Sequence, residues 1–184
     1  KVDSIYICPW SYLDPLAQSQ SIPYLECLIQ DKNTFVLITF ENDSYQMSKI
    51  KENSIKIELQ EKGIFWYPVK FYQGNNLYSK IKQNVFSLVT IIKTIIKHSP
   101  KIVHSRGSLP LITALTICII FNLKFLYDAD SLLSEEYTDT NHLSADSLGF
   151  KFLAWSEKVA RHRASQIIVL TEKLKTVYQT KFKV

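Results

Sequence analysis

The stretch from residue 101 to residue 171 constrains the fold most strongly, because short apolar strands alternate in it with helical segments. Alternation of this kind is typical of a parallel, doubly wound α/β sheet with helices on both faces. Its middle helix is apolar all round, so we expect it to be buried. The elements predicted here are strands over 101–105, 124–128 and 166–170, helices over 109–121 and 149–164, and a last helix capped by Thr171 that runs to Val177.

The first hundred residues continue the same pattern. Pro23 fits the first turn of a helix, where its missing N–H costs nothing, or it kinks that helix. Pro68 indicates the end of a strand or a position at the edge of the sheet. The elements predicted here are strands over 4–8, 34–40 and 64–69, a helix that starts between Asp14 and Ser21 and runs to Gln30, a weak helix over 45–53 and a long helix over 76–97.

Size and composition indicate one ordinary globular domain over residues 1–184. The chain is 46% hydrophobic and 21% charged, with four glycines, which argues against disorder and low complexity. A chain of this length buries a core without disulfide staples. Cys8, Cys27 and Cys118 lie far apart without metal-site spacing, so we expect buried thiols in a reducing, cytoplasmic compartment.

The net charge of +5 is modest, and the lysines are scattered rather than clustered. Such a surface permits an anionic partner but does not indicate a nucleic acid. No signal peptide is visible, and the longest apolar run, 109–121, is too short to span a bilayer. Because the chain opens with Lys and stops on a predicted helix, we interpret it as a piece of a longer protein.

Polar residues follow two of the predicted strands. His104 and Arg106 end the fourth strand, and Asp128 and Asp130 end the fifth. Open α/β sheets bind ligands outside the carboxyl ends of their strands, so these residues are candidates for a site. A guanidinium at the end of a buried strand needs a partner, which is either a ligand phosphate or one of the two carboxylates. His104 either contributes to the site or packs beneath the loop.

Three further groups are weaker candidates. The first strand–helix loop has no glycine-rich dinucleotide fingerprint, but it offers Gln18, Ser19 and Gln20 to a sugar or phosphate, or merely to helix capping. Glu135 and Glu136 either meet a substrate hydroxyl or face water. The Asp128-x-Asp130 pair mimics a DxD metal motif, but we assign no metal site, because such a pair alone is weakly specific.

The long helix over 76–97 carries a basic stripe with one aromatic residue. Lys82, Phe86, Lys93 and Lys97 fall opposite its Ile/Leu face. Such a stripe either faces solvent or lies on an anionic membrane, where each Lys gains about 1 kcal/mol.

Four segments in order resemble the N-terminal, acceptor-side half of bacterial GT-B glycosyltransferases of family 4. The similarity covers nearly the whole chain and is weakest over 42–62 and 70–80. One departure stands out, because Asp130 replaces the basic residue that the family has after the fifth strand, while Arg106 and Asp128 match. The segments are DPLAQSQSIPYLECL with the LITFE strand, KIVHSRGSLPLITAL, KFLYDADSLLSEEYTD and EKVARHRASQIIVLTEKLK.

The resemblance implies one Rossmann-like half of a GT-B fold. It also implies that a C-terminal domain outside this chain binds the nucleotide-sugar donor, and that this half binds a glycan or lipid-linked acceptor for cell-surface polysaccharide synthesis. In that reading Arg106 and Asp130 are the catalytic candidates, and the enzyme requires no cofactor. Two alternatives stay open: a non-catalytic Rossmann-like ligand-binding module, and a metal-dependent GT-A transferase that uses Asp128 and Asp130.

Overall fold

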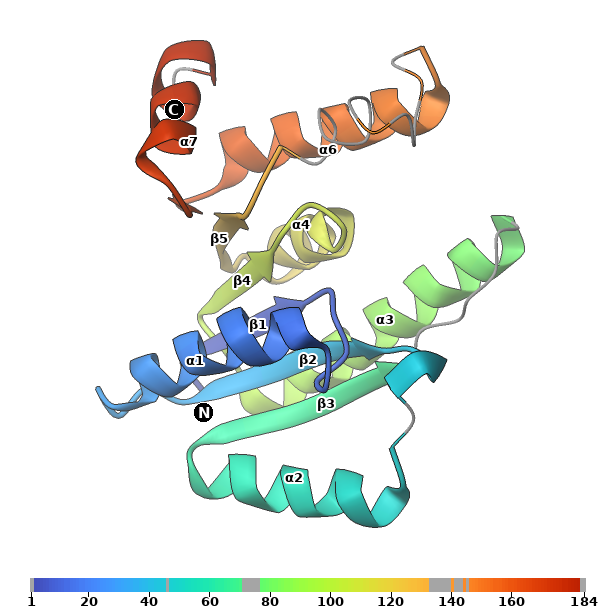
Figure 1. The fold of residues 1–184 in the computed structure, drawn as a ribbon, viewed down its shortest axis with the longest axis vertical. Helices are drawn as coiled ribbons and strands as arrows, with labels where there is room; N and C mark the ends of the chain where they lie inside the picture. The colour runs from blue at the N-terminus through green and yellow to red at the C-terminus, as the bar shows by residue number, and fades with distance from the viewer. Residues whose placement is uncertain are drawn as a thin grey trace. The chain divides into compact units, whose positions relative to one another are not determined.

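The structure, a computed structural model, describes residues 2–45, 47–70, 77–132, 140, 144 and 146–182, without the side chains of 43 and 77–84. Its six strands form a sheet in the order β3-β2-β1-β4-β5-β6 (Figure 1). The pairs β1–β2, β2–β3 and β5–β6 are parallel. This order confirms the predicted α/β, doubly wound parallel sheet flanked by helices.

The chain divides into two compact units, residues 1–103 and 104–184, with the division inside β4. The first unit contains β1 (Ser4–Cys8), η1 (Ala17–Ser21), α1 (Ile22–Ile29), β2 (Phe35–Glu41), η2 (Asp43–Tyr45), α2 (Lys49–Glu61), β3 (Ile64–Lys70) and α3 (Leu77–His98). After β4 (Ile102–Arg106), the second contains α4 (Leu111–Phe121), β5 (Lys124–Ala129), α6 (Leu148–Arg163), β6 (Gln166–Val169), α7 (Glu172–Val177) and η3 (Tyr178–Phe182).

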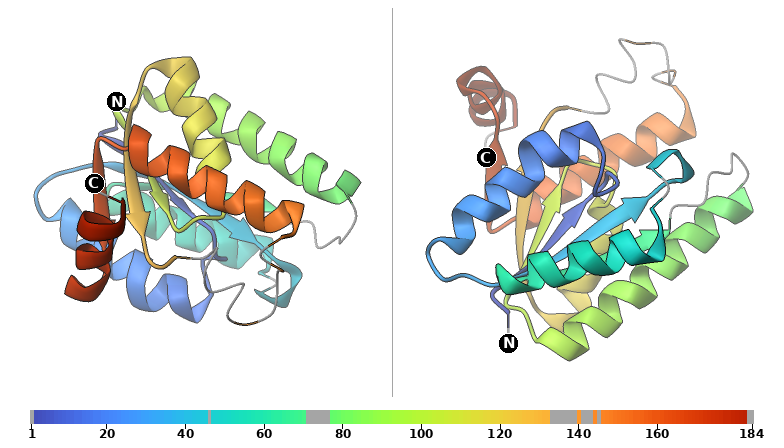
Figure 2. Two further views of the ribbon diagram at one scale, coloured as in Figure 1. Left: turned by 90° about the horizontal axis from the view of Figure 1, so that it is seen from above. Right: turned by 60° about the horizontal axis from the view of Figure 1, so that its bottom comes forward.

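The core of the first unit follows from strand alternation. All of β1 is buried, and successive side chains point to opposite faces of the sheet. Tyr6 and Cys8 belong to the hydrophobic cluster that includes Leu25 of α1 and Leu59 of α2. Helices α1 and α2 therefore cover this face, and α3 lies on the other side of the strands (Figure 2).

Helix α2 differs from the prediction of a weak helix over 45–53. It begins at Lys49, because Ser48 is its N-cap and accepts a hydrogen bond from the Lys51 amide at 3.2 Å. It continues to Glu61 although Leu59 is its only buried residue. The polar sequence between 42 and 62 hides this helix, since a single core contact produces almost no apolar periodicity.

Two predictions of burial are only partly right. Helix α4 is buried along one side, but Ile119 and Ile120 are 64% and 60% exposed, and Leu109 before it is 64% exposed. Cys8 and Cys118 are buried free thiols, whereas Cys27 is exposed. The apolar run over 109–121 therefore predicted more burial for α4 than the structure shows.

None of the described helices is long and apolar enough to cross a membrane.

A buried carboxylate ties the loop after β1 to the end of β2. Glu41 Oε1 accepts hydrogen bonds from the Tyr12 amide at 2.9 Å and from the Thr39 hydroxyl at 2.5 Å. The Thr39 hydroxyl in turn accepts from the Trp66 indole at 2.7 Å. Burial raises the pKa of Glu41, and these hydrogen bonds oppose that rise. Glu41 thus orders the loop after β1. Burying its carboxyl group costs more free energy when that group is ionised.

We expect Glu41→Gln to preserve the fold and Glu41→Ala to lose about 1–3 kcal/mol, because only alanine leaves the Tyr12 amide without its acceptor. A raised folded-state pKa stabilises the protein most below the unfolded value of about 4.3, and that contribution disappears as pH rises through the folded value. The stability of the native chain relative to Glu41→Gln should therefore fall in urea unfolding as the pH rises above about 4.3. A constant difference would contradict the assignment.

Candidate functional site

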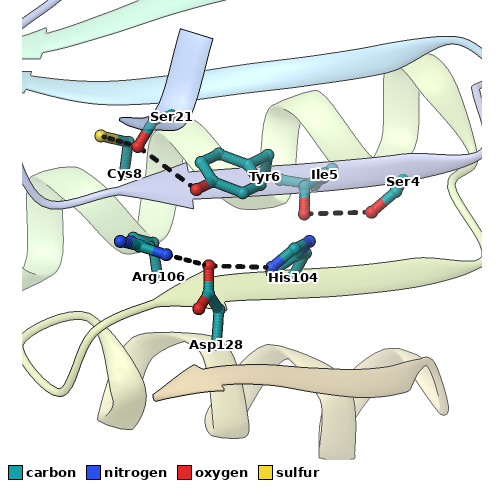
Figure 3. Close-up of polar contacts among 8 residues, drawn as sticks. All are labelled: Ser4, Ile5, Tyr6, Cys8, Ser21, His104, Arg106 and Asp128. Atoms are coloured by element: carbon teal, nitrogen blue, oxygen red, sulfur yellow. Dashed lines mark hydrogen bonds and ion pairs between the residues drawn. The ribbon is translucent and has the colours of Figure 1, made fainter. Parts of the chain in front are cut away.

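The candidate site begins with an ion pair between β4 and β5. The guanidinium Nη1 of Arg106 lies 2.6 Å from Asp128 Oδ2, and His104 Nε2 lies 3.6 Å from the same oxygen (Figure 3). All three residues are at least 95% buried. His104 and Arg106 share one side of β4 because they are two residues apart. The structure thus brings together three residues that the sequence placed at strand ends.

Burial makes this pair important for stability. Removing one partner of a buried ion pair typically costs about 3–5 kcal/mol, because the other charge is left without compensation. Asp128 Oδ1 and the Ser105 hydroxyl are also buried, and they make no hydrogen bond within the described part of the chain. Asp128 is therefore one partner of Arg106, as the sequence analysis offered, and a contact of Arg106 with a ligand phosphate stays a prediction.

A glycine turn places Asp130 beside this pair. Gly107 has a φ of +68°, which L side chains rarely adopt, and its amide donates to the Asp128 carbonyl at 2.8 Å. A Cβ at Gly107 would lie 3.2 Å from Asp130 Oδ2. The absence of a side chain at Gly107 thus lets the Asp130 carboxyl group lie close against the turn.

The environment of Asp130 suits a proton-transfer role. Burial raises its pKa, and the negative charge of Asp128 also raises it, while the guanidinium of Arg106 lowers it. The net direction is upward, so Asp130 holds a proton at a higher pH than an exposed aspartate does. A carboxyl group whose pKa is raised by burial is a candidate general acid or base. The catalytic role of Asp130 stays a prediction that this environment suits.

A polar network that the sequence analysis missed supports the same turn. The Ser108 hydroxyl donates to Glu157 Oε1 at 2.7 Å and lies 3.1 Å from the Tyr127 hydroxyl. Glu157 on α6 is only 2% exposed, and burial raises the pKa of Tyr127. The network anchors the residue after Gly107 to both β5 and α6. The sequence offered one sign of this network, which is that Glu157 is an acidic residue in a helix whose other charged residues are cationic.

The residues predicted in the first strand–helix loop lie on η1. The Gln18 amide donates to the Tyr12 carbonyl at 2.5 Å, and the Ser19 hydroxyl donates to the Pro15 carbonyl at 2.7 Å. Gln18, Ser19 and Gln20 are exposed. Neither contact caps a helix, because η1 and α1 have no side-chain cap hydrogen bond, and a ligand role for the three residues stays a prediction. Glu135 and Glu136 lie outside the described residues.

The predicted membrane-contact stripe lies on α3. Phe86 is 46% exposed, Lys93 and Lys97 are exposed, and the side chain of Lys82 lies outside the described part of the structure. Lys97 Nζ lies 5.6 Å from the centre of the Tyr67 ring. Exposure is compatible with either alternative, solvent or membrane, so the membrane role stays a prediction.

A hollow of about 360 Å³ lies between α6, β6 and α7. Arg161 and Lys175 are among its lining residues, but both cations already have partners. Arg161 lies 3.9 Å from the centre of the Phe182 ring, and Lys175 Nζ lies 3.3 Å from Glu172. None of the predicted site residues lines this hollow, so the site is assigned from the chemistry at β4 and β5.

No protein-family model and no curated protein matches the sequence. Solved structures do match. The chain resembles sucrose-phosphate synthase from Thermosynechococcus elongatus at 13% identity and a TM-score of 0.64, covering 97% of this chain and 45% of that one. It resembles the enzyme LpCGTa, solved in complex with UDP, at 12% identity and a TM-score of 0.57, covering 94% and 47%.

The chain also resembles Glycyrrhiza uralensis UGT73P12 at 10% identity and a TM-score of 0.57, covering all of this chain and 46% of that one. At these identities the likeness establishes the fold, which is the Rossmann-like half of a GT-B glycosyltransferase. The chain spans slightly less than half the length of these structures. The predicted resemblance is therefore confirmed at the level of the GT-B fold, and not for family 4.

A double-mutant cycle tests the ion pair. We expect Arg106→Ala or Asp128→Ala alone to lower the free energy of unfolding by about 3–5 kcal/mol, because each removes the oppositely charged partner of a buried group. The double variant should lose clearly less than the sum of the two. Denaturant unfolding with circular dichroism provides the measurement, and additive losses would show that the two groups do not interact.

Proposed function

We propose that this chain is the acceptor-binding half of a glycosyltransferase that moves a sugar from a nucleotide-sugar donor to a cell-surface polysaccharide or lipid-linked glycan. The observation that carries the proposal is the position of Asp130. A desolvated carboxyl group with a raised pKa lies against the Gly107 turn in a fold that resembles half of a GT-B glycosyltransferase. Acceptor hydroxyls require a base to remove their proton.

Within this proposal, Asp130 and Arg106 share the catalytic work. Asp130 takes the proton of the acceptor hydroxyl if the enzyme inverts, or binds a sugar hydroxyl if it retains. Arg106 is held by Asp128, and its positive charge adjusts the pKa of Asp130. Asp128 and His104 complete the substrate-binding cluster, and Gln18, Ser19 and Gln20 are proposed to contact the substrate from η1.

The donor belongs to a second domain in this proposal. LpCGTa was solved with UDP, and the present chain corresponds to slightly less than half of it. A domain outside this chain would thus hold the nucleotide sugar, and no cofactor is required. We place the enzyme in the cytoplasm, where nucleotide sugars are available, with a peripheral membrane contact that brings it to lipid-linked acceptors.

The charge around Asp128 argues against the GT-A alternative. Asp128 Oδ2 already pairs with Arg106 at 2.6 Å, and a divalent cation there would meet a fixed positive charge. No cluster of three metal-ligating side chains occurs within the described ranges. A non-catalytic binding module remains the competing function, and an activity measurement on the full-length polypeptide separates it from a transferase.

We expect Asp130→Asn in the full-length polypeptide to lower the turnover number about 10- to 150-fold, because one charge-assisted interaction is worth roughly 1.5–3 kcal/mol. Release of the nucleotide from a panel of nucleotide sugars, with glycan acceptors, provides the measurement. Asp146→Asn, which changes an exposed aspartate of the same unit, is the matched control. Turnover of Asp130→Asn equal to that of the control would refute the assignment.

We further expect the isolated 184-residue chain to transfer no sugar. Only one wall of the proposed cleft belongs to this chain, so substrate positioning and water exclusion are lost. The same nucleotide-release assay on the purified chain provides the test, and sustained sugar transfer without any partner would contradict the two-domain proposal.

A further inference from the structure

Helix α6, labelled in Figure 1, carries exposed apolar side chains that no predicted function uses. Leu148, Phe152 and Trp155 are 85%, 58% and 54% exposed. They are spaced by four and three residues, so they lie along one side of the helix. The Phe152 and Trp155 rings stack with their centres 5.9 Å apart. Large aromatic side chains left in water together indicate a binding surface rather than scattered exposure.

The charges on α6 complement an anionic partner. Lys151 and Lys158 are exposed and flank the apolar residues on the same side of the helix. The single acidic residue of the helix, Glu157, is 2% exposed and accepts a hydrogen bond from Ser108 inside the protein. Within Leu148–Arg163, the outer side of α6 therefore presents apolar side chains and positive charges, and the exposed Asp146 lies just before it.

We propose that this side of α6, the α6 face (Leu148, Lys151, Phe152, Trp155 and Lys158), binds the surface of an anionic lipid bilayer. A Trp beside Lys residues is typical of helices that lie in the interface, where the ring sits at headgroup level and the ammonium groups meet lipid phosphates. A protein partner is less well matched, because Lys is depleted at the centres of protein interfaces whereas Arg is enriched.

This inference does not depend on sugar transfer. It uses only the composition and exposure of α6, so lipid binding can succeed or fail whatever reaction the protein performs. It also differs from the α3 stripe predicted from the sequence. Phe86, Lys93 and Lys97 of that stripe include no Trp, whereas Trp155 on α6 supplies an interfacial anchor and an intrinsic fluorescent probe.

The test uses the 184-residue chain and vesicles of equal parts phosphatidylglycerol and phosphatidylcholine. We expect co-sedimentation with these vesicles, a blue shift of tryptophan emission, and much weaker binding to pure phosphatidylcholine. Lys151→Ser with Lys158→Ser should weaken binding about 30-fold, from about 1 kcal/mol per Lys. Phe152→Ser with Trp155→Ser should weaken it at least roughly tenfold through the lost apolar area. Trp155→Phe should keep binding but lose the blue shift.

Matched controls separate the α6 face from other exposed residues. Ile50→Ser with Ile57→Ser removes two aliphatic side chains of α2 that are 84% and 62% exposed, and this variant should bind as the native chain does. Lys93→Ser with Lys97→Ser tests the α3 stripe. Three results would each overturn the proposal. The first is that the folded α6 variants bind as the native chain does, and the second is that the native chain does not bind. The third is α6-dependent self-association in analytical ultracentrifugation without lipid binding.

Discussion

The buried contact between Arg106 and Asp128 is the interaction on which the candidate site depends. It joins the last residue of β4 to β5 at 2.6 Å, in a region where water does not screen the charges. The backbone adds to it, since the Gly107 amide donates to the carbonyl of the same aspartate at 2.8 Å. Side chain and main chain of Asp128 together therefore fix the turn that follows β4.

The rest of the site is arranged around that turn. Gly107 leaves room for Asp130 on one side, and Ser108 reaches the buried Glu157 on α6. The apolar helix α4 connects β4 to β5 and packs against α6 and β5, so the two strand ends and α6 are held together by the core of the second unit. In the proposed function, Asp130 thereby lies against a turn that the Arg106–Asp128 pair and the Ser108–Glu157 hydrogen bond hold in place, as positioning for proton transfer requires.

The sequence predicted the sheet because strands and their ends are encoded locally. Apolar runs located all six strands to within about one residue, and strand periodicity placed Arg106 and Asp128 on neighbouring polar ends. The sequence could not show which side chains contact one another. Nothing local distinguishes Glu157, which is buried against Ser108, from an exposed helix glutamate, and nothing in the run 109–121 marks Ile119 and Ile120 as exposed. Burial of single side chains is decided by tertiary packing.

The charge balance of the cluster bears on which ligand it favours. Asp128 neutralises Arg106, so the guanidinium offers little net attraction to a second anion. Asp130 adds a further acidic group to the cluster, and burial raises its pKa. A phosphate would meet repulsion once Asp130 ionised, whereas a neutral hydroxyl could donate to the carboxylate or transfer its proton to it. In the proposed function, this charge balance supports a neutral acceptor hydroxyl rather than a donor phosphate as the partner of Asp130.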